Sequence, residues 1–287
     1  MAGHFIAHIR SKDKAIQFLD EHLSATSLLA GQFADKIGLK EIGEILGLVH
    51  DLGKASNEFQ NYIRSATGSL DPDGDGVSDF EVKKGKVDHS SAGAQVVFRN
   101  LHSKGKAGLI AAQFLSLCIA SHHSGIIDCL SPNGENAFNA RIEKSEEKTH
   151  ANEAISNLEE VEEKLIGLLS LGIENQLIQK MKGMRENNDS QETLIFKYGL
   201  LLRFIFSCIL DADRLDTADF EIPGNTRIRN YGRYTSWSTL IQRLDLKIKE
   251  FENKEQKNVV DVIRNQVSQA CYDFSTKPKG IYQLTVP

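Results

Sequence analysis

The stretch Ile45-Leu-Gly-Leu-Val-His50-Asp51-Leu-Gly-Lys54 joins a strongly apolar segment directly to ionisable side chains. A helix that is apolar on nearly every side is buried, so its last turn should be buried too. Ionisable groups are costly there unless they are paired or bind a metal ion. The negative end of the helix dipole also favours a cation. The stretch therefore predicts a core helix over 40–50 that ends at a polar site.

Two more apolar segments end in the same way. The segment 115–120 runs into His122-His123, and the segment 204–210 runs into Asp211 and Asp213. His22 lies on the apolar face of a predicted helix over 14–37, and His89 opens another predicted helix. Imidazole and carboxylate together suit Mn, Fe, Co, Ni or Zn, whereas an all-oxygen set suits Mg or Ca.

So many candidate ligands exceed what one tetrahedral site needs, and a carboxylate can bridge two ions. We therefore expect two divalent metal ions. Each segment also has a simpler interpretation: His22 as a hydrogen-bonded core histidine, His50-Asp51 as a helix-end pair, His122-His123 as a cap on the helix dipole, and Asp211 and Asp213 as caps of the following turn. The coincidence of several such segments favours the metal site.

Helical periodicity dominates the rest of the chain. Helices are predicted over 14–37, 40–50, 56–64, 89–102, 106–122, 193–211 and 240–274, with surface helices within 143–183. Asp189-Ser-Gln-Glu192 resembles a capping box. Loops are predicted over 65–88 and 221–236, and the only strand over 281–286. The expected fold is mainly α, a helical bundle with a metal site at the ends of its core helices.

Composition indicates an ordinary globular protein. The 287 residues carry a net charge of −5, with 40% hydrophobic and 25% charged residues, which excludes a disordered, collagen-like or disulfide-rich chain. No uninterrupted apolar run is long enough to span a bilayer, and the start does not read as a signal peptide. The four cysteines form no CxxC pair, and buried thiols in the cytoplasm are the simplest interpretation. We expect no membrane partner.

These residues resemble the HD nuclease domain of the CRISPR-associated helicase–nuclease of type I interference systems, within the HD superfamily of metal-dependent phosphohydrolases. His50-Asp51-Leu-Gly-Lys54 is similar to the HDxxK signature, and His22 to the histidine of the family's first helix. His89-Ser-x-x-Gly-Ala94, the pair His122-His123 and Ala212-Asp213 match further family segments.

The resemblance implies the ligands of both metal ions. One ion would take His22, His50, Asp51 and Asp213. The other would take His89, His122 and His123, with Asp51 bridging. Asp213 is preferred to Asp211 as the ligand, and that choice stays open. Lys54 would contact a phosphate oxygen or orient the water, and a solvated lysine is the alternative.

The resemblance also implies the reaction: hydrolysis of phosphodiester bonds in single-stranded DNA, as an endonuclease or exonuclease, through two-metal activation of water. The ions would be Mn, Fe, Co or Ni, and Mg stays open. The implied partners are a helicase domain of the same full-length protein and a guide-RNA surveillance complex. We expect an HD nuclease domain over 1–275, with 65–88 and 124–192 as loop or helical insertions, and a linker strand over 276–287 that leads toward the helicase.

Two weaker patterns lie outside this set. Asp71, Asp73, Asp75 and Asp79 have the spacing of a calcium loop, but Val82 stands where an EF-hand has glutamate. Arg227, Arg229 and Arg233 interleave with aromatic residues, which is one pattern of nucleic-acid binding. Two rival functions remain: an HD phosphohydrolase that acts on nucleotides or cyclic dinucleotides, and an all-α interaction module whose histidines and aspartates form a buried polar network.

Overall fold

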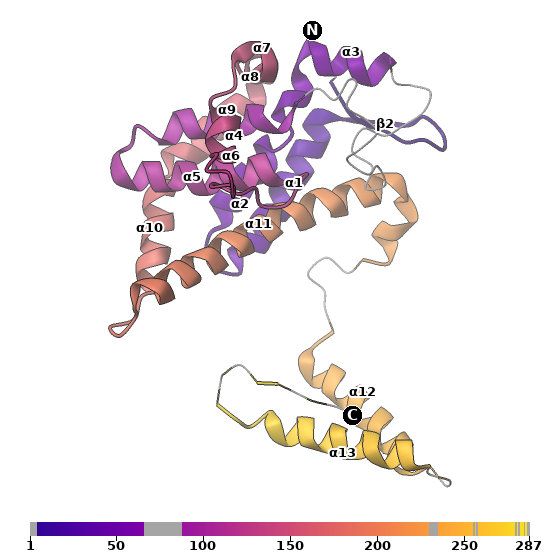
Figure 1. Cartoon of the computed structure of the whole chain (residues 1–287). Helices are drawn as coiled ribbons and strands as arrows, with labels where there is room; N and C mark the ends of the chain where they lie inside the picture. The colour runs from indigo at the N-terminus through magenta and orange to yellow at the C-terminus, as the bar shows by residue number, and fades with distance from the viewer. Residues whose placement is uncertain are drawn as a thin grey trace. The chain divides into compact units, whose positions relative to one another are not determined.

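A computed structural model describes residues 5–65, 88–229, 235–254, 256, 258–278, 280, 282–283 and 285. The chain divides into two compact units, Met1–Thr226 and Arg227–Pro287. The described part is mainly α, as expected (Figure 1). In chain order, the elements are β1 (Ile6–Ile9), β2 (Ile16–Phe18), α1 (Leu19–Asp35), α2 (Lys40–Val49), the 3-10 helix η1 (Leu52–Ala55), α3 (Asn57–Ser65), α4 (Ser90–Leu101), α5 (Gly105–Ser121), α6 (Ala137–Ile142), α7 (Glu146–Thr149), α8 (Ala151–Ser156), α9 (Glu159–Ser170), α10 (Ile173–Gly183), α11 (Gln191–Glu221), the 3-10 helix η2 (Pro223–Arg227), α12 (Trp237–Glu252) and α13 (Val259–Phe274).

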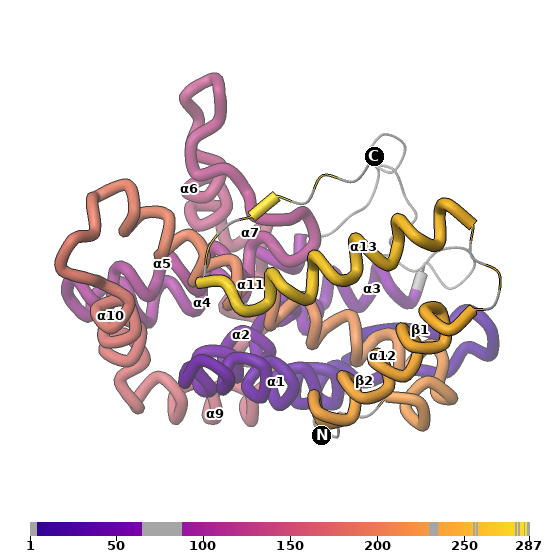
Figure 2. The backbone as a smooth tube through the Cα atoms, turned by 90° about the horizontal axis from the view of Figure 1, so that it is seen from below, coloured from indigo at the N-terminus to yellow at the C-terminus, as the bar shows by residue number. Residues whose placement is uncertain are grey.

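Helix α2 is the centre of the first unit. It packs against α1, α5, α9 and α11, and Figure 2 shows α1 running beside it. Its apolar side chains, Ile42, Ile45, Leu46, Leu48 and Val49, are all at most 1% exposed. A helix covered on every side explains why its sequence is apolar nearly all round.

Two glycines let the backbones around α2 approach one another. A Cβ at Gly47 of α2 would lie 2.5 Å from the Ser27 nitrogen of α1. A Cβ at Gly93 of α4 would lie 1.9 Å from the Val49 carbonyl oxygen at the end of α2. Only glycine fits at such separations. The three helices therefore come close enough for their polar ends to share one site.

The N-terminal segment contains a hairpin that the sequence patterns did not predict. The predicted helix over 14–37 is wrong at its start, because Ile16–Phe18 forms β2, which pairs antiparallel with β1, and α1 begins only at Leu19. Strands of four and three residues are too short to show a period-two pattern. Gln60 fastens the hairpin to the core, because its side chain bonds both Ile6 backbone groups at 2.9 and 3.0 Å and the Lys54 carbonyl at 2.8 Å.

Helix α11 begins and ends differently from the prediction. Its N-cap is Ser190, which accepts from the Thr193 N–H at 3.2 Å, rather than Asp189 in a capping box. The helix continues ten residues past the predicted end at Asp211, to Glu221. Within the described ranges it is the one helix long and apolar enough to cross a membrane, by length and composition. Its buried residues, among them Leu201 and Ile209, pack in the core of the first unit.

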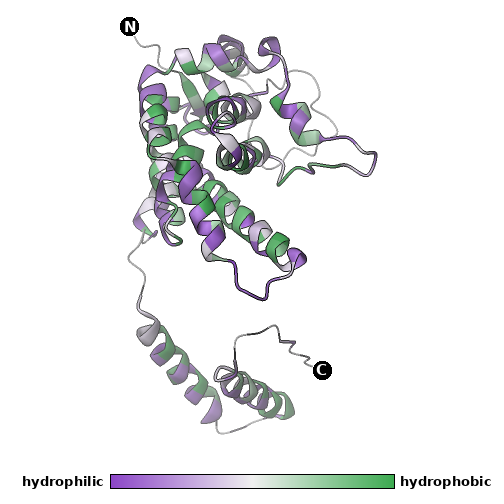
Figure 3. Cartoon of the chain, turned by 90° about the vertical axis from the view of Figure 1, so that its left-hand side faces the viewer, coloured by the Kyte–Doolittle hydropathy of each residue, from purple (hydrophilic) through white to green (hydrophobic). Residues whose placement is uncertain are grey.

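Other expectations need correction as well. The helices within 143–183 are not all surface elements, because Leu165, Leu169 and Leu177 belong to the core. The single helix predicted over 240–274 is two helices, α12 and α13. Neither has a buried residue, and Figure 3 shows a hydrophobic and a hydrophilic side on each. In the predicted strand over 281–286, the described residues Tyr282, Gln283 and Thr285 are not in a strand.

All four cysteines are free thiols. Cys118 and Cys208 are buried, but Cys129 and Cys271 are exposed. The expectation of buried thiols therefore holds for two of them.

Candidate metal centre

The seven predicted ligands come from the ends or inner faces of five helices in the first unit. His50 is the C-cap of α2, and Asp51 follows it at the start of η1. His122 is the C-cap of α5, and His123 follows. His22 lies early in α1, His89 is the N-cap of α4, and Asp213 lies on α11. The structure brings all seven together into two groups of possible metal ligands that share Asp51.

The first group contains His22, His50, Asp51 and Asp213. The Nε2 atom of His22 lies 3.2 Å from Nε2 of His50, 3.4 Å from Oδ2 of Asp51 and 3.4 Å from Oδ1 of Asp213. The Nε2 atom of His50 lies 3.3 Å from Oδ2 of Asp51 and 3.6 Å from Oδ1 of Asp213. Four donor atoms on separate elements thus surround one point.

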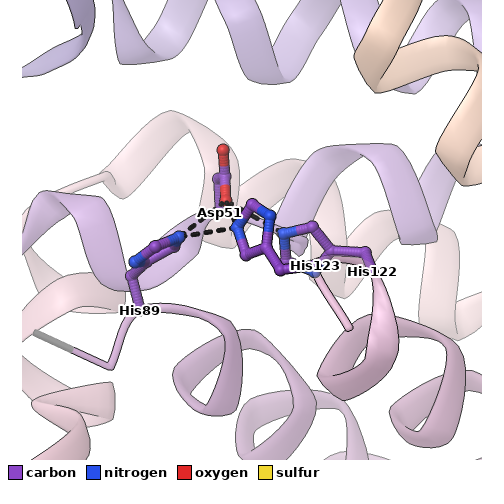
Figure 4. A group of neighbouring side chains, drawn as sticks. All are labelled: Asp51, His89, His122 and His123. Atoms are coloured by element: carbon purple, nitrogen blue, oxygen red, sulfur yellow. Dashed lines mark hydrogen bonds and ion pairs between the residues drawn. The ribbon is translucent and has the colours of Figure 1, made fainter. Parts of the chain in front are cut away.

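The second group contains Asp51, His89, His122 and His123 (Figure 4). Here the other carboxylate oxygen of Asp51, Oδ1, lies 3.7 Å from Nε2 of His89, 3.2 Å from Nε2 of His122 and 3.7 Å from Nε2 of His123. The Nε2 atoms of His89 and His123 are 2.7 Å apart. Asp51 therefore faces one group with each of its oxygens.

These separations suit a metal ion. Nitrogen and oxygen ligands lie about 2.1 Å from Zn²⁺, and a tetrahedron of that radius has edges of about 3.4 Å. Five of the six edges of the first group measure 3.2 to 3.6 Å. The donor set, imidazole nitrogen with carboxylate oxygen, is one that first-row transition metals prefer. The first group therefore fits a metal ion by distance and by donor type, and the second group fits one by donor type.

Backbone carbonyls fix two of the imidazole rings. The Nδ1–H of His50 donates to the Gly47 carbonyl at 3.0 Å, and the Nδ1–H of His122 donates to the Ile119 carbonyl at 2.6 Å. Each acceptor lies three residues earlier, on the last turn of the histidine's own helix. A helix end leaves such carbonyls without intrahelical partners. In the neutral ring the bond leaves Nε2 as the lone-pair nitrogen, and Nε2 is the atom that points into the group.

The electrostatics of the first group favour a cation at its centre. Burial of the His22 ring opposes its charged form, but Asp213, Asp216 and Asp51 outweigh burial and hold the pKa of His22 well above its usual value. For His50, burial is likewise outweighed by Asp51 and Asp213, and the pKa rises to about 9. Burial raises the pKa of Asp213, but hydrogen bonds from His22 and His50 bring it well below the usual value. Without a metal ion, protons on the histidines balance the carboxylates.

In the second group the pKa of a buried histidine is lowered rather than raised. Burial and the neighbouring His123 lower the pKa of His122 to about 4. This ring is therefore neutral at neutral pH and already in the form that binds a metal ion.

Lys54 is the cation nearest to Asp51. Its side chain is 0% exposed, which contradicts the solvated-lysine alternative, and its Nζ lies 3.0 Å from Oδ2 of Asp51 and 3.4 Å from the Ala7 carbonyl. Burial raises the pKa of Asp51, but Lys54 and His50 outweigh it and hold that pKa well below the usual value. In this position Lys54 offsets the charge of the Asp51 carboxylate, and its contact with a phosphate oxygen or the water stays a prediction.

Exposure separates the two acidic candidates on α11. Asp213 is 16% exposed at its side chain and faces His22 and His50. Asp211, two residues earlier, is exposed and belongs to neither group of donors. This geometry favours Asp213 as the ligand, as the sequence interpretation preferred.

Three residues that the sequence analysis did not assign to the site also contact it. Asp216 bonds His22, Gln17 bonds Asp216, and the buried His8 ring lies edge-on to His22 with centroids 4.9 Å apart. One signal was available for Asp216, because residues three apart share a helix face and Asp213 was already a candidate. Gln17 gave no signal, because its contact depends on the unpredicted hairpin.

The two weaker predicted sites remain predictions. Arg227 is exposed and Arg229 is partly buried, and both belong to the second unit. Arg233 and the four aspartates Asp71, Asp73, Asp75 and Asp79 lie outside the described residues.

Comparison with known families agrees with the geometry. The model of the family described as Cas3, HD domain, matches residues 11–189, which is more than half of the chain. The match includes every predicted ligand except Asp213, which the fold brings to the group from outside the matched segment. It also extends through residues 124–189, which the sequence analysis treated as a loop or helical insertion. No curated protein sequence matches the chain. The chain belongs to the family of the HD domain of Cas3, and it is a metal-dependent nuclease of type I CRISPR systems.

Proposed function

We propose that the protein hydrolyses phosphodiester bonds of single-stranded DNA with two divalent transition-metal ions, Mn, Fe, Co or Ni, in the cytoplasm. A helicase separates the strands of a duplex, so a nuclease that works with the Cas3 helicase meets single strands. We further propose that a guide-RNA surveillance complex directs this pair to its target.

The observation that carries the two-metal part of the proposal is the position of Asp51. Its Oδ2 faces His22 and His50 at 3.4 and 3.3 Å, and its Oδ1 faces His122 at 3.2 Å. A carboxylate that offers one oxygen to each of two donor groups is the arrangement of a bridging ligand. Two bound ions at such a bridge supply an activated water and neutralise the charge that builds on the phosphoryl oxygens.

The protein's own residues prepare this site. Lys54 keeps Asp51 anionic, and the carbonyls of Gly47 and Ile119 place the proton of the neutral His50 and His122 rings on Nδ1, so that Nε2 is the atom that faces the centre. The rings are thus oriented before any ligand binds, and preorganised charge is a large source of catalytic power.

Exposure supports an approach of the substrate from one side. The side chains of His22, His50 and His122 are 0% exposed, and that of Asp51 is 1% exposed. His123 is 34% exposed at its side chain. A phosphodiester would therefore approach past His123, on the side of the second group.

Cleavage of circular single-stranded DNA tests the proposal. The metal-stripped protein is re-supplied separately with Mn²⁺, Co²⁺, Ni²⁺ or Mg²⁺, and circular RNA of the same sequence is run beside the DNA. We expect cutting with the transition metals and its loss in Asp51→Ala, because both groups lose a ligand. Asp211→Ala is the matched control, because it removes a carboxylate outside both donor groups.

The same metal-loaded protein, given nucleotides in place of DNA, tests the alternative function of a nucleotide phosphohydrolase. Turnover of nucleoside triphosphates or cyclic dinucleotides, with intact circles under every metal, would favour a nucleotide phosphohydrolase and contradict the proposal. Cutting of RNA circles in preference to DNA would contradict the DNA part alone.

A further inference from the structure

We propose that Asp216 is a positioning residue that orients His22 for metal binding, with Gln17 holding Asp216 in place. This inference rests on the proposed metal centre and adds two residues to it that belong to neither donor group. It gives the N-terminal hairpin a part in the nuclease site.

The contact between Asp216 and His22 is short and well placed. Oδ2 of Asp216 lies 2.6 Å from Nδ1 of His22. The His22 ring is 0% exposed, and the Asp216 side chain is 14% exposed. An ionised carboxylate only accepts hydrogen bonds, so Nδ1 of His22 carries the proton and donates. In the neutral ring Nε2 then keeps its lone pair, and Nε2 is the atom that faces His50, Asp51 and Asp213.

His22 is held differently from the other two fully buried rings. His50 and His122 are C-caps and donate to carbonyls of their own last helical turns. His22 lies near the start of α1, where backbone N–H groups rather than carbonyls are left over. Its Nδ1 therefore needs an acceptor from elsewhere in the fold, and α11 supplies Asp216. Because a charged acceptor strengthens the ligand more than a carbonyl does, Asp216 also makes Nε2 a better donor to a cation.

Gln17 completes the arrangement from a third element. Its Nε2 donates to the same oxygen of Asp216, Oδ2, at 2.7 Å. Gln17 lies on β2, is 8% exposed, and pairs with His8 of β1. The hairpin thereby fixes the rotamer of the carboxylate in which Oδ2 meets the ring.

Metal titration of the full chain tests the inference by a readout other than cleavage. Mn²⁺ is titrated calorimetrically into the wild type, Asp216→Ala, Asp216→Asn, Gln17→Ala and the control Asp211→Ala, which removes an exposed carboxylate from the same helix. In Asp216→Ala, we expect one of two binding steps to weaken by about 10–100-fold and the other to stay unchanged. Asp216→Asn keeps an acceptor for the Nδ1–H of His22, so its Mn²⁺ affinity in that step should fall less. Gln17→Ala should weaken the same step.

The outcomes separate this inference from the proposed function. A wild type that binds no metal would overturn the centre itself. Two binding steps in the wild type, with Asp216→Ala equal to Asp211→Ala or weakened equally in both steps, would overturn the role of Asp216 alone. Asp216→Asn preserves the side-chain volume and carries the test if Asp216→Ala does not fold.

A spectroscopic measurement gives the tautomer directly. With Zn²⁺ as a diamagnetic probe, long-range ¹H–¹⁵N correlation should find the His22 proton on Nδ1 in the wild type. A proton on Nε2 with Nδ1 toward the metal would contradict the inference.

Discussion

Asp51 is held between the Lys54 ammonium group and two sets of imidazole rings, and this position decides the chemistry of the centre. The side chain is 1% exposed, and each of its oxygens faces a different set. A buried carboxylate is costly unless cations or hydrogen bonds surround it. In the metal-free protein, Lys54 and His50 lower its pKa. A bound metal ion would take over part of that charge balance.

At the residue scale, the two donor groups should differ in how metal affinity depends on pH. The pKa of His50 is about 9, so below that pH a metal ion must displace its proton. The pKa of His122 is about 4, so this ring is already neutral. Affinity for the ion held by His22 and His50 should rise with pH by about tenfold per unit for each proton released, because the pKa values of both rings are raised.

Calorimetry in buffers of different ionisation enthalpy measures the protons released in each step. We expect the His22 and His50 step to release protons and to be lost first on acidification. Equal proton release in both steps, or none in either, would contradict this assignment of charge.

At the element scale, the site exists because α2 and α4 touch backbone to backbone. Gly93 makes the contact, and a methyl group there would lie 1.9 Å from the Val49 carbonyl oxygen. His89 begins α4 and His50 ends α2. Any separation of the two helices therefore moves a ligand of the second group away from Asp51.

Gly93→Ala should cost about 1–3 kcal/mol in the free energy of unfolding, because the added methyl group overpacks the α2–α4 contact. Gly167→Ala is the matched control, because Gly167 is exposed in α9 and an added methyl group would meet nothing within 4 Å. Gly167→Ala should raise the free energy of unfolding by about 0.5–1 kcal/mol, because alanine has the higher helix propensity. Urea unfolding of the metal-free proteins measures both. An unchanged free energy of unfolding in Gly93→Ala would show that α4 can move to make room for the methyl group without cost.

At the scale of the whole molecule, bound metal ions should link segments that are far apart in the sequence. The ligands span residues 22 to 213, and most of them come from α1, α2, α4, α5 and α11 or their caps. An ion that binds the folded chain alone stabilises it by mass action. Two ions shared through Asp51 would tie the N-terminal half of the first unit to α11.

Metal removal should therefore lower the melting temperature. At an Mn²⁺ concentration of about 100 times Kd, each site contributes about 2.7 kcal/mol, which for a chain of this size is roughly 5–10 °C. Differential scanning calorimetry with Mn²⁺ and with EDTA measures the shift. We expect the shift to fall to half or less in a His50→Ala, Asp51→Ala double variant, which removes two ligands of the first group and one of the second. The same shift in that variant would mean that Mn²⁺ stabilises the protein at another place.

The sequence by itself determined the helical class of the fold and indicated seven residues that the structure brings together. The ends of apolar helices pointed to His50-Asp51, His122-His123 and the aspartates of α11, because ionisable groups at a buried helix end need a partner. Asp213 was distinguished from Asp211 only by the family resemblance, and the exposure of Asp211 agrees with that choice.

Only the tertiary structure decided how these donors are oriented. The hairpin of β1 and β2 is too short to leave a periodic pattern, so Gln17 gave no sign of its contact with Asp216. The burial of Lys54 could not be predicted either, because a lysine after glycine is usually solvated and here η1 packs inward. Residues at an apolar helix end reveal that a polar site exists. Which atoms face one another depends on contacts between segments up to 199 residues apart, and such contacts form only in the folded chain.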